Sequence, residues 1–516
     1  MNKAPIDTEL SPQQLQAKLL ETEALHQSEK ADLQALLAQA EDKYQRLLEQ
    51  FRLAQHQRFG KSSEVSPEQA SLFNEAEEEC DKDESADVET ITYSRNKPKR
   101  KPLPAELPRT VIVHDIPDED KTCECCGHDL HKIGEDISEK LAFVPAKVEV
   151  LQHVRPKYAC RHCETHNTIT PIKQTPVPPS PIPKGIATPS LLSQIITAKY
   201  QYHMPLYRQE TQFKQWGIHL SRRTMSDWMM KSSQLLQVLV DKIKSILIRL
   251  QVLHADETTL NVLSEDRAKC YMWVYCSGTD SPGNHEQPNI VLYDYRVSRH
   301  GHHAVDFLDG FSGYLHYDGY QGYAQTKATL VGCWAHARRK FVEAQRVQVK
   351  GKVGSSDWAI NHIKKLYRLE IKLKGQPAAD KYQLRQEEAG PLLKAFKEWL
   401  DKAVMRISPK TKLGEAISYT LNQWPKLMRY IEDGRLSIDN NRAERAVKPF
   451  VMGRKNWMFS NTASGAQASA VLYSIIETAK ANGLMPFDYI NHCLTQLAID
   501  PNEVESLLPW KVNLNV

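Results

Sequence analysis

Three acidic residues, far apart in the sequence, are of the type that phosphate chemistry requires. Asp256 lies in "HADETT", Asp318 in "GYLHYDGYQGY" and Glu444 in "DNNRAERAVKPF". If the fold brings the three carboxylates together, they supply enough hard oxygen ligands for one or two magnesium ions. Such ions activate a water or a 3′-hydroxyl for in-line attack on phosphorus. An acidic residue after a strand is also a common helix cap or turn former, so each one alone is a weak signal.

The segment around Glu444 predicts an amphipathic helix. Its polar face holds Asn441, Glu444, Arg445 and Lys448, at positions i, i+3, i+4 and i+7. A second stripe, suited to burial, holds Ala443, Ala446, Val447 and Phe450. In a purely structural alternative, Asn441 is the N-cap and Glu444 its capping-box partner. Pro449 is expected to weaken or kink this helix and to turn the basic segment "GRKNW" in a new direction.

The two aspartates are expected at the ends of strands. The segments "LQVLHADETTLNVL", "CYMWVYCS" and "NIVLYDYRVS" are rich in β-branched and aromatic residues and predict adjacent strands. An open α/β sheet exposes its functional groups at strand ends, where we place Asp256 and Asp318. Glu257 is the neighbour of Asp256, and adjacent side chains of a strand point to opposite faces, so only one of them enters the site.

Two CxxC pairs predict a structural zinc site. Cys123 and Cys126 lie in "CECC", and Cys160 and Cys163 lie in "CRHC". Two such turns place four thiolates around one tetrahedral ion, and the closed shell leaves no position for chemistry. Four reduced thiols in a small sheet are the alternative. Nearby substitutes for these ligands are Cys125, His128, His162 and His166.

The segment "YRQETQFKQWGIHLSRRTMSDWM" predicts a helix, a turn at Gly217 and a second helix capped by Ser221. Arg222 and Arg223 lie near the start of the second helix. This order is typical of a helix-turn-helix, whose second helix presents its N-terminal residues to DNA. A plain helical hairpin uses the same turn.

The N-terminal region predicts a short coiled coil followed by a linker. The seam positions alternate steps of four and three, as in Leu33, Leu37, Ala40, Tyr44, Leu47 and Phe51. A solitary amphipathic helix explains the same few heptads. Arg58 and Lys61 follow in "RFGKSSE", before the acidic run "EAEEECDKDES" and the basic cluster "RNKPKRKPLP", which is either solvated or in contact with phosphates.

Length and composition indicate a cytoplasmic protein of several modules. A chain of 516 residues exceeds one compact core, and its net charge of +4 is too small to indicate a polyanionic partner by itself. No apolar run approaches the roughly 18 residues that a membrane span needs. The N-terminus lacks the apolar core of a signal peptide, so the cysteines are expected to stay reduced.

Taken together, these motifs resemble the transposases of the bacterial insertion-sequence 66 family. The resemblance covers Arg58 to about Leu494. It is carried by "RFGKSSE", the paired CxxC knuckles, "HADETT", "YDGYQGYA", "GCWAHARRKF" and "DNNRAERAVKPFVMGRKNW". Several motifs in one order are far more specific than any one of them.

The resemblance implies a DDE transposase with a ribonuclease-H-like α/β core and two Mg²⁺ (or Mn²⁺) ions per active site. The triad is then Asp256, Asp318 and Glu444, with one structural Zn²⁺ and a large α-helical insertion before Glu444. Supporting roles fall to Cys333 and His336 of "CWAH" and to Asn441; alternatively, Cys333 is simply buried and His336 only hydrogen-bonded. The candidate DNA contacts are Arg58, Lys61, Arg222, Arg223, Arg338, Arg339, Arg445, Lys448, Arg454 and Lys455.

The expected function is therefore transposition. The protein would bind the terminal inverted repeats of a mobile element, cut DNA by metal-dependent hydrolysis and join the 3′-hydroxyl ends to target DNA. Its expected partners are these DNAs, a second copy of the chain or a larger assembly, and accessory proteins of the same element, with no membrane and a location at the bacterial nucleoid. The alternatives are a transposase-derived DNA-binding or regulatory protein without catalysis, and a ribonuclease-H-type nuclease.

The expected architecture is multidomain α+β. The modules and the residues assigned to them are a coiled coil with "RFGKSSE" (1–64), an acidic and basic linker (65–108), a zinc-binding β module (109–170), a proline-rich linker (171–187), a helix-turn-helix-like region (188–248), the first part of the catalytic core (249–340), the helical insertion (341–435), the second part of the core (436–495) and a C-terminal tail (496–516).

Overall fold

The computed structural model describes residues 12–59, 109–112, 114, 138, 140–141, 148–159, 172–267, 269–278, 287–348 and 354–514. The chain forms two compact units, Met1–Ala86 with Pro176–Val516, and Asp87–Thr175. In the described part of the second unit, β1 (Lys157–Tyr158) pairs antiparallel with β2 (Lys173–Gln174). The predicted zinc ligands Cys123, Cys126, Cys160 and Cys163 lie outside the described residues.

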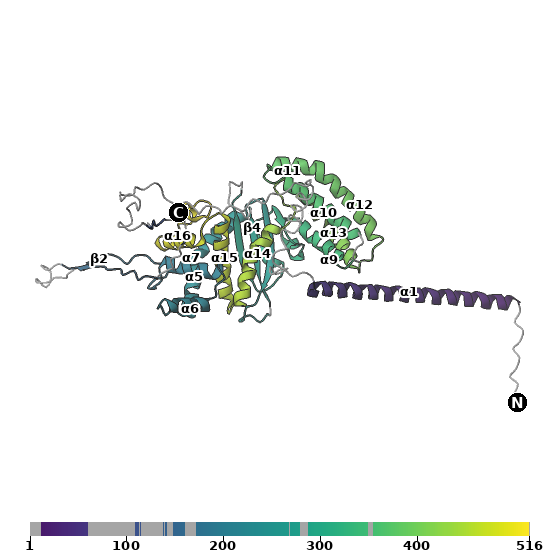
Figure 1. Cartoon of the computed structure of the whole chain (residues 1–516), viewed down its shortest axis with the longest axis horizontal. Helices are drawn as coiled ribbons and strands as arrows, with labels where there is room; N and C mark the ends of the chain where they lie inside the picture. The colour runs from purple at the N-terminus through teal and green to yellow at the C-terminus, as the bar shows by residue number, and fades with distance from the viewer. Residues whose placement is uncertain are drawn as a thin grey trace, which may run out of the picture. The chain divides into compact units, whose positions relative to one another are not determined.

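Five strands of the larger unit form one mixed sheet in the order β5-β4-β3-β6-β7 (Figure 1). The first three are antiparallel neighbours, whereas β6 joins β3 and β7 joins β6 in parallel. Nearly all residues of β4 and β5 are buried, which explains why these segments are almost continuously apolar. The bounds are β3 (Val252–Leu260), β4 (Cys270–Ser277), β5 (Ile290–Arg296), β6 (Tyr314–His316) and β7 (Thr329–Val331).

Helix α15 (Ala463–Ala481) covers the edge strand β5, and α14 (Asn441–Trp457) packs against β3 and β4 (Figure 1). The hydroxyls of α15 bond the free backbone groups of β5. Ser474 Oγ accepts from the Tyr293 N–H at 2.8 Å, and Thr478 Oγ1 accepts from the Val291 N–H at 3.1 Å. An edge strand otherwise exposes unpaired donors and acceptors, so α15 closes this side of the sheet.

The region before β3 is helical, as predicted. It contains α5 (Pro189–Tyr200), α6 (Leu206–Gln215) and α7 (Arg222–Leu247), and α16 (Pro486–Ile499) packs on α5 and α7. Gly217 between α6 and α7 has a φ of +80°, a conformation that glycine adopts readily. Ser221 Oγ accepts from the Thr224 N–H at 3.2 Å and so caps α7.

Between β7 and α14 the chain forms a helical insertion, whose hydrophobic core also includes Val252 of β3 and Val331 of β7. As predicted, its described residues contain helices and no strand. The helices are α9 (Trp334–Arg346), α10 (Ser355–Lys372), α11 (Ala378–Leu384), α12 (Gly390–Val404) and α13 (Lys412–Met428), with a π-helical turn η3 (Arg385–Ala389) between α11 and α12. Trp334 Nε1 donates to the Leu427 carbonyl at 2.9 Å and joins α9 to α13.

The N-terminal helix α1 (Pro12–Phe59) contains the predicted coiled-coil seam. Leu33, Leu37 and Tyr44 are exposed, and a partner helix for them stays a prediction. Near the end of α1, Arg52 Nη1 donates to the Val347 carbonyl at 2.9 Å, and Glu49 Oε2 accepts from the Lys412 N–H at 3.0 Å.

The remaining short elements are α8 (His302–Phe307), η2 (Gln321–Gln325), η4 (Arg429–Ile431) and η5 (Glu505–Leu507). Among the helices of the described residues, none has the length and apolar character needed to cross a membrane.

Candidate active site

Asp256 and Asp318 come from neighbouring parallel strands. The last residue pair of β3 and β6 is His254 with His316, and each aspartate lies two residues beyond it. Because parallel strands end at the same edge of a sheet, the two carboxyl groups emerge side by side. The predicted position of Asp256 at the end of a strand is wrong in one respect, because β4 continues to pair with β3 as far as Leu260. Asp256 is therefore central in β3, and only its parallel neighbour has ended.

Hydrogen bonds fix the turn that carries Asp318. Asp318 Oδ1 accepts from the Tyr320 N–H at 2.9 Å, and the Asp318 carbonyl accepts from the Tyr419 hydroxyl at 3.1 Å. Gly319 between them has a φ of +103°, where any side chain would be strained. Asp256 Oδ1 accepts from the Glu257 N–H at 2.8 Å. In both aspartates the second carboxylate oxygen, Oδ2, takes no part in these hydrogen bonds.

Glu444 lies in the first turn of α14 and is 4% exposed. The capping-box interpretation is wrong, because the helix begins at Asn441 after an N-cap residue, Asn440, that makes no side-chain cap bond. Asn441 Nδ2 donates instead to Asp439 Oδ2 at 2.8 Å. The Glu444 side chain is thus not used to close the helix end and is free for another role.

Pro449 does not end α14, which continues to Trp457. The basic segment "GRKNW" therefore stays in the same helix, contrary to the predicted change of direction. A proline inside a helix removes one backbone hydrogen bond. The neighbouring Val447 and Phe450 are buried against the sheet, and their burial offsets that loss.

Mutual repulsion shows that the carboxylates converge. Burial raises the pKa of Asp256 well above its usual value, and the charges of Glu257, Asp318 and Glu444 raise it further. Burial also raises the pKa of Glu444 to about 7, with Arg339 acting in the opposite direction and Asp439 and Asp318 adding to the increase. Groups that interact electrostatically in this way lie near one another, which indicates that β3, the turn after β6 and α14 meet at one acidic site.

The "CWAH" segment lies against Glu444. His336 Nδ1 is 3.5 Å from Glu444 Oε1, and Arg339 Nη2 is 3.6 Å from Glu444 Oε2. Burial and Arg339 lower the pKa of His336 to about 4, so its imidazole is neutral at pH 7. The ligand atoms of Cys333, His336 and Glu444 lie within 4.8 Å of one another. Cys333 itself is buried and precedes α9.

Asn440 connects the elements beneath the site, and the sequence analysis missed it. Its Nδ2 donates to the Ala255 carbonyl at 2.8 Å, its Oδ1 is 3.1 Å from His254 Nδ1, and its N–H donates to Cys333 Sγ at 3.2 Å. The rings of His254 and His316 stack with centroids 4.4 Å apart. This one residue, at the start of α14, thus joins β3 and the N-terminus of α9. The only sequence signal was the pair of asparagines after Asp439.

Glu257 is held by two further residues that the sequence analysis missed. Arg299 Nε and Tyr323 Oη donate to its two carboxylate oxygens at 2.8 and 2.7 Å. The Arg299 guanidinium also lies 3.9 Å from the ring centroid of Tyr320, and the Tyr320 hydroxyl bonds the Arg299 carbonyl. These contacts tie β3 to the segment that follows Asp318. Arg299 carried no recognisable local signal, whereas Tyr323 lies within the motif "YDGYQGYA".

The candidate DNA contacts differ in accessibility. Arg338 is only 3% exposed, so the structure does not place it where a phosphate reaches it. Arg454 donates to Thr259 Oγ1 at 3.0 Å and packs the end of α14 on β3. Arg339 faces Glu444, and Arg445 and Lys448 are half-buried on α14.

The remaining basic candidates are Arg58, Lys61, Arg222, Arg223 and Lys455. Arg223 and Lys455 are exposed. Arg222 is also exposed, but its Nε is 3.1 Å from Glu210 Oε2. Arg58 lies in α1, and Lys61 lies outside the described residues.

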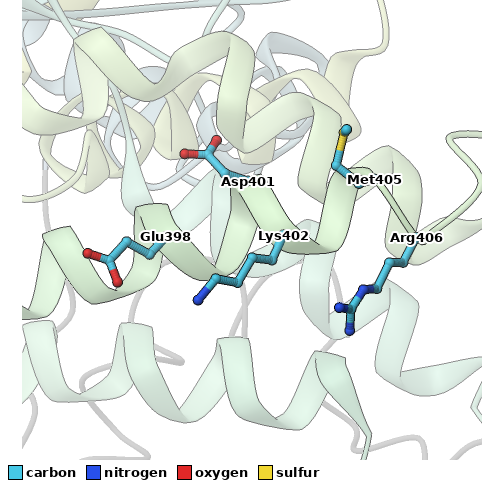
Figure 2. Close-up of a pocket in the computed structure, with 5 residues that line it drawn as sticks. All are labelled: Glu398, Asp401, Lys402, Met405 and Arg406. Carbon is cyan, nitrogen blue, oxygen red and sulfur yellow. The ribbon is translucent and has the colours of Figure 1, made fainter.

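A shallow surface hollow lies elsewhere, on the helical insertion. Figure 2 shows that its lining comes from α12 and the residues just after it, namely Glu398, Asp401, Lys402, Met405 and Arg406. Its acidic and basic side chains are mixed, and it contains none of the predicted site residues.

The acidic site fits divalent cations. Its donors are carboxylate oxygens, which Mg²⁺ and Mn²⁺ prefer. Among the described residues, Glu444 Oε1 is buried and has no hydrogen-bond partner. Burial and the charges of neighbouring carboxylates raise the pKa values of Asp256 and Glu444. A bound cation would give Glu444 Oε1 a partner and would offset the repulsion between the carboxylates.

Comparison with protein families covers nearly the whole chain. The model described as "Transposase IS66 family" matches residues 184–468, which include Asp256, Asp318 and Glu444. The "zinc-finger binding domain of transposase IS66" matches residues 120–164, which hold both CxxC pairs. The "Transposase C of IS166 homeodomain" matches residues 46–112, and the "IS66 C-terminal element" matches residues 474–510. These matches define a DNA transposase with zinc-binding and DNA-binding domains.

The chain belongs to the IS66 transposase family. Three relatives from Sinorhizobium fredii (strain NBRC 101917 / NGR234) are similar over most of their length. The uncharacterized protein y4qI is 33% identical over 510 residues, 94% of this chain and 92% of the relative. The uncharacterized proteins y4hP and y4jD are 33% and 34% identical, over 81% and 79% of this chain and 78% and 81% of each relative.

Proposed function

We propose that this chain is an active DNA transposase. It binds the terminal inverted repeats of an insertion sequence, cuts DNA by divalent-metal-dependent hydrolysis and joins the 3′-hydroxyl ends to target DNA. The observation that carries the proposal is the electrostatic coupling of Asp256, Asp318 and Glu444, three acids from separate elements of a transposase-family chain. A phosphodiester is itself an anion, so an acidic site of this kind suits DNA only when cations neutralise it.

Asp256, Asp318 and Glu444 would hold two Mg²⁺ or Mn²⁺ ions. When bound, the ions activate a water or a 3′-hydroxyl and stabilise the leaving oxygen of an in-line displacement. The protein itself keeps the three carboxylates in position. Asp256 stands on a strand that is hydrogen-bonded on both sides, Asp318 on a turn held by Tyr320 and Tyr419, and Glu444 on a buried helix. Rigid supports of this kind keep the three oxygens in place.

Burial and Arg339 act in opposite directions on the charge of Glu444, and His336 lies beside it. His336 is neutral because its pKa is about 4, so it fills the space beside Glu444 without forming a permanent ion pair. Arg339, at 3.6 Å, favours the ionised carboxylate. Since the pKa of Glu444 is about 7, cation binding near neutral pH releases a proton from this residue. Once cations hold Glu444, Arg339 is available to a DNA phosphate.

The mixed sheet is the ribonuclease-H-like core that the family resemblance implies. Three antiparallel strands followed by two parallel ones, with acids beyond β3 and β6 and on the later helix α14, support this assignment. The helical insertion lies between the second acid and the third, as expected. Cys123, Cys126, Cys160 and Cys163 hold one structural zinc ion, and α1 pairs with a second copy to bring two element ends together.

A cleavage and strand-transfer assay tests the proposal. Purified full-length protein is incubated with Mg²⁺ and duplex DNA that carries the element ends, and nicked or joined products are resolved on a denaturing gel. Asp256→Ala should bind the end DNA and give no product. The matched control is Asp294→Asn, which changes a buried aspartate of the same sheet that pairs with Arg296 outside the acidic site. It should retain cleavage.

Two outcomes would contradict the proposal. Equal activity of the wild type and Asp256→Ala would remove the catalytic assignment. End binding without any metal-dependent cleavage, with every protein of the element supplied, would instead favour a DNA-binding regulator descended from a transposase.

A further inference from the structure

A histidine-rich cluster lies in the connection between β5 and β6, apart from the three carboxylates. It consists of His302, His303 and Asp306 of α8, whose ligand atoms all lie within 4.8 Å of one another. His302 and Asp306 are exposed and one helical turn apart, whereas His303 is 7% exposed. Two imidazoles and a carboxylate form a ligand set that suits Zn²⁺ and similar transition metals, and does not suit Mg²⁺.

The ring of His303 is held as metal-binding histidines usually are. Its Nε2 is 2.8 Å from Ser298 Oγ, so one ring nitrogen is committed to a hydrogen bond that orients the imidazole. Its Nδ1 is buried, and it has no hydrogen-bond partner among the residues that the structure describes. Buried polar atoms without a partner are uncommon and call for an explanation. A bound cation at Nδ1 supplies one.

We propose that His302, His303 and Asp306 bind one Zn²⁺ ion, with a water as the fourth ligand. Ligands of tetrahedral zinc at ~2.0–2.1 Å stand about 3.3 Å apart, so the cluster must close slightly on binding. The two side chains that have to move, His302 and Asp306, are the exposed ones. The nearby Arg296 pairs with Asp294 at 2.7 Å, which reduces its repulsion of the ion.

The position of the cluster indicates a structural role. Helix α8 packs against η2, the turn that follows Asp318. The approach is close at Gly301, where a Cβ would lie 2.5 Å from the Gly322 carbonyl oxygen. A metal ion bound by these three residues would stabilise α8 itself, and through it the packing of α8 on the segment after Asp318 and the position of Arg299, the partner of Glu257. This inference concerns zinc binding and does not depend on the proposed transposition activity.

Metal analysis of the full-length protein tests the site. Wild-type protein and the double variant His302→Ala/Asp306→Ala are equilibrated with Zn²⁺, passed through a desalting column and measured for zinc per chain. The variant should hold one zinc fewer than the wild type and keep the zinc of the CxxC module. Both changed residues are exposed, so the variant should fold. His219→Ala, which removes an exposed histidine between α6 and α7, is the matched control and should lose no zinc.

Cobalt substitution separates the two kinds of site. Co²⁺ bound by thiolates gives a strong near-ultraviolet charge-transfer band, whereas Co²⁺ on imidazole and carboxylate gives only weaker visible bands. The double variant should lose visible intensity and keep the thiolate band. Equal zinc content and equal cobalt spectra in the wild type and the double variant would overturn the proposal.

Discussion

The acidic site of the sheet and the Arg385 site of the helical insertion both bury charge, but they differ in how that charge is balanced. Arg385 is 2% exposed and donates to both oxygens of Glu370, at 2.8 and 2.6 Å. It also donates to the carbonyls of Tyr430, Asp433 and Leu436. Asp256 is half-buried, but its charged neighbours are the acids Glu257, Asp318 and Glu444.

This difference separates a structural centre from a functional one. A buried charge with every donor satisfied stabilises a single arrangement and has nothing left to offer a ligand. Buried carboxylates that raise one another's pKa destabilise the protein until something else compensates them. The buried charge of the insertion therefore stabilises its structure. The carboxylates of the sheet repel one another, and this repulsion favours the binding of the cations that the proposed reaction requires.

Neutralising one acid of the sheet should have the largest effect. We expect Asp256→Asn to lower the rate of DNA cleavage by roughly 10⁴-fold or more, because residues that act as one unit fail together. The same change should leave the stability of the metal-free protein equal or higher, since it removes a repelling charge. Cleavage kinetics and thermal unfolding in Mg²⁺-free buffer measure the two effects. A large loss of stability would mean that Asp256 is structural, like Arg385.

Replacing Arg385, the buried guanidinium of the helical insertion, should lower the stability of the protein. We expect Arg385→Met to lower the free energy of unfolding by about 3–5 kcal/mol, because it leaves Glu370 buried without a partner. Urea unfolding measures this change. The control is Arg385→Met/Glu370→Met, which removes both charges and should be more stable than Arg385→Met alone. If the double variant is the less stable one, the pair is not the source of the effect.

The parts that the sequence predicts well depend on local patterns. The apolar stripe Ala443, Ala446, Val447 and Phe450 follows from helical periodicity alone, and all four side chains are buried. The strands around Asp256 and the helical character of the insertion follow from composition in the same way. The predicted change of helix direction after Pro449 is wrong, because tertiary packing outweighs the preference of one residue.

The parts that the sequence does not predict depend on distant partners. Arg385 lies in an ordinary charged helical segment, and its partners are Glu370 and three carbonyls between residues 430 and 436. Asn440 joins Ala255, His254 and Cys333, which are more than a hundred residues away along the chain. Hydrogen bonds between such distant groups leave no periodic signal. The resemblance indicated which acids belong together, but not what holds them.

The pH dependence of stability should reveal the charge of Glu444. Its pKa is about 7 in the folded protein, against 4.5 for the ordinary group, so the folded state binds the extra proton between these values. The metal-free wild type should therefore lose stability as pH rises from about 4.5 to 7, by up to roughly 3 kcal/mol. Glu444→Gln should lack this part of the pH dependence and be the more stable protein at pH 8.

Thermal unfolding across this pH range in Mg²⁺-free buffer makes the measurement. Glu415→Gln, which changes an exposed glutamate of α13, is the control and should follow the wild type. Parallel curves of stability against pH for the wild type and Glu444→Gln would show that Arg339 already compensates the carboxylate. The acidic site would then be charge-balanced, as the Arg385 site is.

An exposed ion pair of the helical insertion should contribute the least to stability of the charged groups compared. Lys397 Nζ is 2.7 Å from Asp401 Oδ1, four residues further along α12, and both side chains are solvated. Water screens the pair, and the aspartate stands on the C-terminal side, where the helix dipole disfavours it. We expect Lys397→Ala to change the free energy of unfolding by about 0.3–0.5 kcal/mol or less, measured by urea unfolding beside Arg385→Met. A loss as large as that of Arg385→Met would mean that burial is not what distinguishes these charges.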